Sequence, residues 1–104
     1  MDINLDEVEI RNNQDARRFE TKVGDYFALI DYIPAGKNIV FTHTEVPKIF
    51  EGQGVASKMA KTALEYAKEN NLQVIPLCPF VAGYIRKHPE YQSLVWNAKM
   101  YIKE

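Results

Sequence analysis

The chain has 104 residues, of which 46% are hydrophobic and 26% charged, a composition typical of one folded domain spanning residues 1–104. Its formal net charge of -1, with acidic and basic residues spread along the chain, argues against partners such as nucleic acid or an anionic membrane. A single cysteine, no apolar leader and no apolar run of roughly 20 residues favour a cytoplasmic protein without a disulfide or a membrane span.

The first half of the chain predicts an antiparallel meander of four strands. Val8 and Ile10 alternate with charged residues, a polar turn follows over 12–15, and alternation resumes over 19–23. The turn signal Gly24-Asp25 leads into a third strand over 26–33, which is rich in aromatic and β-branched residues. Another turn over 34–38 then leads into a fourth strand over 39–46.

After Pro47 the apolar period becomes helical. An amphipathic helix is expected to end near Asn70 and Asn71, and its apolar face holds Ala56, Met59, Ala60, Ala63, Leu64 and Ala67. Residues 72–78 predict a short buried strand, and Pro79 suits the first turn of a second helix. Strand, helix and strand form a βαβ unit, which makes its two strands parallel. The expected fold class is therefore α/β (α+β), with no clear period over 91–104.

The loop EGQGVA, residues 51–56, lies at the start of the first helix. It lacks the lysine and hydroxyl of a P-loop and does not match the GxGxxG pattern of dinucleotide folds. Glycine lets a ligand approach the backbone closely, and a helix start presents unpaired amides. Two interpretations remain: Gly52 and Gly54 only shape a turn, or amides from about Gln53 to Ser57, including Val55, bind an anion.

The segment EGQGVASKMAKTALEYAKENNLQVIPLCPF, followed by VAGYI and HPEY, resembles motif A and the start of motif B of the GNAT-type N-acetyltransferases. It is most similar to the small single-domain subgroup of that superfamily. The resemblance implies a GNAT-like fold whose Q/R-x-x-G-x-G/A loop binds the pyrophosphate of acetyl-CoA. Gly54 and Ala56 match the last two fixed positions of that loop. Glu51 stands where arginine or glutamine is usual. Because its negative charge would repel a phosphate, we expect its side chain to point away from the bound pyrophosphate.

The resemblance also implies where the rest of the coenzyme would bind. In GNAT folds the strand before the loop and the strand after the helix splay apart, and the pantetheine arm enters the gap. Here this implies contacts with the backbone of Thr44, Glu45 and Val46, and further contacts with Phe80 and Tyr84. A tyrosine that acts as general acid in many GNAT enzymes would fall at Ile85, so that role is not carried over to this chain.

Two side chains are candidate catalytic groups. Cys78 precedes Pro79 at a helix start, where the dipole favours a thiolate, although a lone cysteine is most often an inert small hydrophobe. Period-two alternation puts His43 on the same strand face as Phe41 and Glu45, where it is either structural or a proton acceptor. Because the two strands are parallel, we expect His43 and Cys78 at the same end of the sheet.

These features predict an N-acetyltransferase that moves an acetyl group from acetyl-CoA to an amine, which belongs to a small molecule or a protein. Direct attack with His43 as base is the preferred route, and transfer through an acetyl group on Cys78 is the other. No metal is expected. The alternative is a non-catalytic regulatory module that binds acyl-CoA, and a third possibility is a small α/β protein whose helix start binds nothing.

Overall fold

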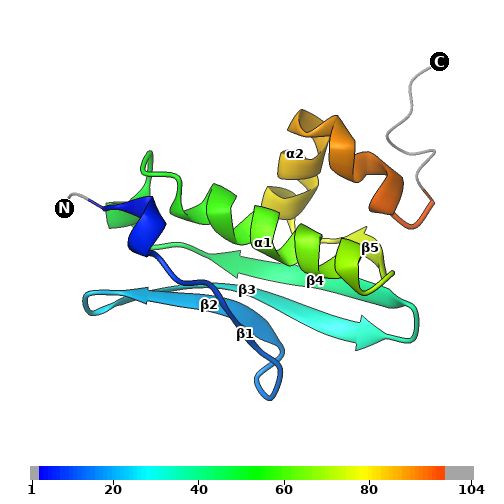
Figure 1. Ribbon diagram of the computed structural model, residues 1–104, viewed down its shortest axis with the longest axis horizontal. Coiled ribbons are helices and arrows are strands. Elements are labelled where there is room, and N and C mark those ends of the chain that lie inside the picture. The colour runs from blue at the N-terminus through cyan, green and yellow to red at the C-terminus, as the bar shows by residue number, and fades with distance from the viewer. Residues whose placement is uncertain (1–2, 98–104) are drawn as a thin grey trace.

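A computed structural model describes residues 3–97, in which five strands form one sheet in the order β1-β2-β3-β4-β5. The strands are β1 (Arg11–Asn13), β2 (Arg18–Val23), β3 (Tyr26–Ala35), β4 (Asn38–Glu45) and β5 (Gln73–Pro76). The helices α1 (Val55–Glu69) and α2 (Pro79–Lys87) lie on the same side of the sheet (Figure 1). Short 3-10 helices occur at Leu5–Glu7, Lys48–Phe50 and Pro89–Leu94. Within residues 3–97 no helix has the length and apolar character needed to cross a membrane.

The antiparallel meander is confirmed for β1 to β4, but its first strand lies later than expected. Strand β1 covers Arg11–Asn13, part of which was assigned to a polar turn, and not Val8 to Ile10. The amide group of Asn13 donates to the Glu20 carboxylate at 3.3 Å, so a polar pair holds this strand to β2. Val8 is buried in the core, which shows that the apolar alternation marked burial and not strand pairing.

A β-bulge interrupts β4 at Thr42. Phe41 pairs with Tyr32 and His43 pairs with Asp31, so one residue of β4 has no counterpart on β3. An extra residue inverts the side-chain alternation beyond it. Phe41 is therefore buried, whereas His43 and Glu45 are exposed on the outer side of the sheet. The predicted common face of His43 and Phe41 is wrong for this reason.

The βαβ unit is confirmed. Residues Asn38 to Phe41 of β4 pair in parallel with Gln73 to Pro76 of β5, and α1 connects the two strands. The helix buries one face in the core, as the period predicted, through Val55, Met59, Ala60, Ala63, Leu64 and Ala67. It ends where expected, since Asn71 has a left-handed φ of 55° and the amide of Leu72 donates to the Ala67 carbonyl at 2.8 Å.

The C-terminal part of the described chain contains one element that the sequence did not indicate. After α2, residues Pro89–Leu94 form a 3-10 helix, which buries Tyr91. Val95 then forms a parallel bridge with Val74, and the amide of Trp96 donates to the Val74 carbonyl at 2.8 Å. This contact extends the sheet beyond β5. The end of the expected domain, residues 98–104, lies outside the described residues.

Candidate functional site

Two glycines in left-handed conformations shape the loop before α1. Gly52 has a φ of 75°, and Gly54, with a φ of 83°, is the N-cap residue of the helix. The amide of Lys58 donates to the Gly54 carbonyl at 3.0 Å and so makes the first hydrogen bond of α1. The amides of 55–57 precede that bond and have no carbonyl partner within the helix. They form a positively polarised end suited to an anion.

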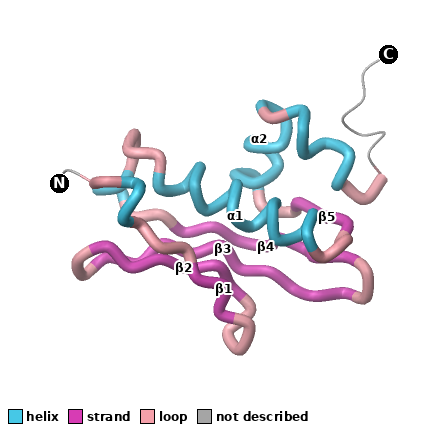
Figure 2. Tube along the Cα trace, viewed as in Figure 1, coloured by secondary structure: helices cyan, strands magenta, loops and turns pink. Residues whose placement is uncertain are grey.

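The beginning of the chain packs against this loop. A Cβ atom on Gly54 would lie 2.8 Å from Cδ1 of Leu5, so the loop needs glycine here for its conformation and for close packing. The ammonium group of Lys58 donates to the carbonyls of Leu5 and Val8. Figure 2 shows the segment near the N-terminus lying beside the loop that leads into α1. Contacts between residues about 50 positions apart therefore fix the helix start.

The Gln53 side chain contacts the N-terminal segment and does not line the cavity described below. Its Oε1 atom accepts from the amide of Ile3 at 3.1 Å, and its Nε2 atom donates to the Ile49 carbonyl at 2.9 Å. The side chain is therefore turned toward the beginning of the chain. Sequence reasoning placed Gln53 among residues that bind an anion through the backbone, and it had no signal for this second role.

Strands β4 and β5 separate at Phe41. Their pairing ends there, and the amides of Leu77 and Cys78 both donate to the Phe41 carbonyl, at 3.0 and 2.9 Å. Among residues 3–97, the rest of β4, through Glu45, has no strand partner on its β5 side. Cys78 is the N-cap residue of α2, and its sulfur lies 2.8 Å from the Thr44 hydroxyl oxygen. The strands thus splay as the sequence resemblance implied.

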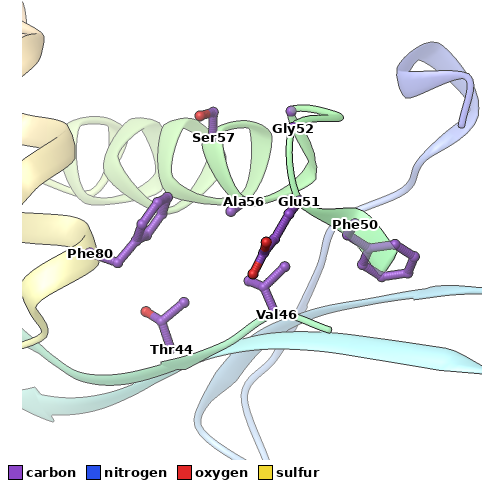
Figure 3. A pocket seen from close by; sticks show the side chains of 9 residues that line it. Thr44, Val46, Phe50, Glu51, Gly52, Ala56, Ser57 and Phe80 are labelled. Carbon is purple, nitrogen blue, oxygen red and sulfur yellow. The ribbon is translucent and has the colours of Figure 1, made fainter. Parts of the chain in front are cut away.

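A cavity of about 570 Å³ lies beside the point where β4 and β5 separate. Figure 3 shows Thr44 at the end of β4 and Val46 just after it, Phe80 entering from α2, and Ala56 facing them from α1, while the Ser57 side chain points away from them. The full lining consists of Thr44, Val46, Phe50, Glu51, Gly52, Gly54, Ala56, Ser57 and Phe80. The size and the mixture of apolar walls with a few polar groups are those of a small-molecule site.

The structure brings six of the expected coenzyme-binding residues to this cavity: Thr44, Val46, Gly54, Ala56, Ser57 and Phe80. The side chains of three others lie elsewhere, since that of Val55 is buried in the core, that of Glu45 is exposed outside, and that of Gln53 faces the N-terminal segment. Their expected contacts are made through the backbone and stay a prediction. Tyr84 lines a neighbouring cavity of about 220 Å³, which shares Ser57 and Phe80 with the first. The two cavities adjoin at these two residues.

Glu51 lines the cavity, although its side chain was expected to point away. Figure 3 shows the carboxylate directed into the space beside Val46. The preceding residue, Phe50, is buried in the core with its ring 6.0 Å from that of Tyr26, and this anchor fixes the backbone from which Glu51 projects. Phe50 and Gly52 also line the cavity, and sequence reasoning did not single out Phe50.

His43 and Cys78 lie near the same end of the sheet but on opposite sides of β4. The Nε2 atom of His43 lies 3.3 Å from a carboxylate oxygen of Glu45, and more than half of each side chain is exposed. Cys78 is buried on the inner side, in contact with Thr44. His43 and Cys78 were expected at the same end of the sheet, but because the bulge at Thr42 turns His43 outward, the imidazole does not lie beside the thiol.

Tyr84 is held by His88 at the end of α2. The two rings stack with centroids 3.8 Å apart and an interplanar angle of 12°, and the Nδ1–H group of His88 donates to the Tyr84 carbonyl at 2.7 Å. Burial raises the pKa of the Tyr84 phenol, and the nearby carboxylates of Glu90 and Glu65 raise it further. Ile85, where the sequence resemblance would place a general-acid tyrosine, is completely buried in the core.

Comparison with known proteins places this geometry in a family. The protein-family model described as GCN5-related N-acetyl-transferase matches residues 18–94 of this chain. Protein NATD1 of Gallus gallus is 30% identical over 90 residues, covering 84% of this chain and 82% of the relative. Protein NATD1 of Homo sapiens is also 30% identical, over 84% of this chain and 80% of the relative. The solution structure of a GCN5-like protein from Staphylococcus aureus matches with a TM-score of 0.67 and 31% identity, covering 85% of this chain and 87% of that one. The predicted GNAT-like fold is thus confirmed.

Proposed function

The chain belongs to the GCN5-related N-acetyltransferase family, and we propose that it transfers an acetyl group from acetyl-CoA to an amine. The observation that supports this most directly is the cavity between the separated end of β4 and the free amides of α1. It offers apolar walls, an unpaired strand edge and a helix start in one continuous space. These are complementary to a long flexible arm that carries amide groups and ends in a diphosphate.

Each part of the cavity has a proposed role in holding the substrate. The amides of 55–57 would bind the diphosphate, and the side chains of Val46 and Phe80 would contact the pantetheine arm. The backbone from Thr44 to Val46 would donate to and accept from the amides of that arm, because β4 has no β5 partner there. Tyr84, in the adjoining cavity, would contact the nucleotide end.

The proposed reaction is direct transfer. The amine nitrogen forms a bond to the thioester carbonyl carbon, the carbon–sulfur bond breaks, and the coenzyme leaves as its thiol. The proton lost by the amine passes to a base, for which we propose His43, held beside Glu45 on the outer side of β4. Neither helix covers that side, so an amine can approach it from solvent (Figure 1).

The position of Cys78 favours direct transfer over a covalent route. The thiol is 2% exposed and lies against the Thr44 hydroxyl, which leaves little access for an incoming thioester. A base within hydrogen-bond reach is one way to activate a cysteine, and His43 does not supply it because it is on the other side of the strand. We therefore assign Cys78 a packing role at the start of α2.

Coenzyme release tests the proposed activity. The protein is incubated with acetyl-CoA and a panel of monoamines, polyamines and lysine peptides, and free thiol is recorded over time. Release that depends on one class of amine supports the transferase and identifies that class. Tight binding with only slow, amine-independent hydrolysis would instead favour the non-catalytic acyl-CoA-binding module, for which the core position of Ile85 is the supporting observation. If melting temperature does not change with coenzyme, the helix start binds nothing.

A further inference from the structure

Of the described residues that line the cavity, Glu51 is the one whose side chain carries a formal charge. It has no salt-bridge partner among residues 3–97, where the ion pairs are Arg18 with Asp31 and His43 with Glu45. Glu51 is an exposed residue whose side chain enters the space between the end of β4 and the start of α1 (Figure 3). An unpaired negative charge thus lies in a site whose proposed ligand is strongly anionic.

The sizes of the opposing charges decide the net effect. A helix start carries the equivalent of roughly half a positive charge, concentrated in its first turn. An ionised carboxylate such as that of Glu51 carries a full negative charge. A carboxylate in the cavity therefore opposes the attraction that the amides of 55–57 exert on an anion at a distance. Hydrogen bonds to those amides remain, but the carboxylate weakens the long-range attraction for a diphosphate.

We propose that Glu51 is a specificity-determining residue that weakens binding of the diphosphate end, so that affinity comes mainly from the pantetheine arm. This inference rests on the proposed function and names a residue that tunes its substrate site. The apolar side chains of Val46, Phe50 and Phe80 supply the compensating contacts with the arm. Weak retention of the anionic end also speeds dissociation of the free coenzyme after transfer.

Calorimetry with two ligands tests this inference. Coenzyme A carries the diphosphate, whereas pantetheine contains the same arm without any phosphate. The series is wild type, Glu51→Gln and Glu51→Lys, and the matched control is Glu69→Gln, an exposed carboxylate at the far end of α1. Glu69 is about 20 Å from the helix start along the axis, beyond the screening length at physiological salt.

For Glu51→Gln we expect coenzyme A to bind about tenfold more tightly at physiological salt, and for Glu51→Lys more tightly still. The gain should shrink as salt rises to about 0.5 M, because exposed charges are then screened. Pantetheine should bind equally to all four proteins. Glu69→Gln should match wild type with both ligands.

Two outcomes overturn the inference while leaving the proposed function intact. Coenzyme A binding to wild type with unchanged affinity in both Glu51 variants shows that the carboxylate rotates away from the ligand. Equal gains for coenzyme A and pantetheine show a change in packing and not in charge. If neither ligand binds wild type or any variant, the proposed function itself fails, and the inference fails with it.

Discussion

The hydroxyl oxygen of Thr44 lies 2.8 Å from the sulfur of Cys78, and this contact joins the free end of β4 to the start of α2. It crosses the point where β4 and β5 separate. A backbone pairing would close that gap, whereas a single side-chain contact leaves the strand edge available to a ligand. Cys78 is therefore positioned to support the walls of the cavity.

Replacement of this cysteine distinguishes the two chemical routes. Because we assign Cys78 a packing role, Cys78→Ala should keep kcat within about threefold of wild type and cost about 1 kcal/mol of unfolding free energy. Steady-state kinetics and urea unfolding measure these quantities. A loss of activity of about 100-fold or more, together with an acetyl thioester detected on the wild-type protein by intact mass, would establish the covalent route.

His43 is the proposed base, and its removal should affect turnover. His43→Gln should lower kcat by about 10²-fold or more, the usual size of a general-base contribution. The KM for acetyl-CoA should change little, because His43 does not line the cavity. Lys22→Gln, at an exposed residue of β2, serves as the control. Full activity in His43→Gln would show that His43 is not the base and that the amine loses its proton to water.

The two loop glycines differ in a way that stability measurements can resolve. Both have left-handed φ values, but only Gly54 would bring a new Cβ atom against another side chain, that of Leu5. Gly52→Ala should cost about 1 kcal/mol and Gly54→Ala about 2 kcal/mol of unfolding free energy. Adding Leu5→Ala to Gly54→Ala should remove the excess. Equal costs for both glycines would mean that Leu5 moves aside freely.

Lys58 should control the order of the N-terminal turn. Lys58→Met keeps the length of the side chain but removes the donors to Leu5 and Val8, so we expect a loss of about 1 kcal/mol. Hydrogen exchange should accelerate at the Val8 amide, which donates to the Leu5 carbonyl at 3.1 Å. Lys61→Met, exposed on the same helix, is the control. An unchanged rate of hydrogen exchange at the Val8 amide in Lys58→Met would show that the N-terminal turn stays ordered without the Lys58 hydrogen bonds.

Tyr91 predicts how stability changes in alkali. Burial raises the pKa of its phenol, and so does the hydrogen bond that the hydroxyl donates to Glu65 at 2.7 Å. An unfolded tyrosine loses its proton near pH 10, whereas the folded protein keeps this one to higher pH. The folded state then binds more protons, so stability falls as pH rises above about 10.

Tyr91→Phe lacks this titration. Its unfolding free energy should be about 1 kcal/mol lower than that of wild type at pH below the unfolded pKa, because the hydrogen bond is lost. Above about pH 10 its curve should fall less steeply than that of wild type. Urea unfolding at closely spaced pH values gives both curves. If the two plots of unfolding free energy against pH are parallel throughout, the loss of stability in alkali comes from other groups. Tyr32 and Tyr84 are candidates, because their pKa values are also raised.

The parts of the fold that could be predicted are those whose signal is local and repeated. The apolar period of α1 continues over the whole helix, and the hairpin turns are marked by glycine and asparagine. Strand β1 was misplaced because Arg11–Asn13 carries no apolar signal and depends on polar contacts with β2. The 3-10 helix after α2 had no period to reveal it.

The site was predicted in outline, but two side-chain directions were not. The bulge at Thr42 depends on register between β3 and β4, which no window of β4 alone contains, and it decides that His43 faces outward. The direction of Glu51 depends on how Phe50 is anchored in the core. In both cases the sequence singled out the residue, but contacts distant in sequence set the direction of its side chain.

The packing of the N-terminal turn against the glycine loop has a practical consequence. Asp6 is exposed within a turn whose neighbours Leu5 and Val8 contact the start of α1, so a probe attached there would sit close to any ligand at that loop. The native thiol is buried, so a maleimide dye would react preferentially with a cysteine introduced by Asp6→Cys. Fluorescence from that dye would follow coenzyme occupancy in real time.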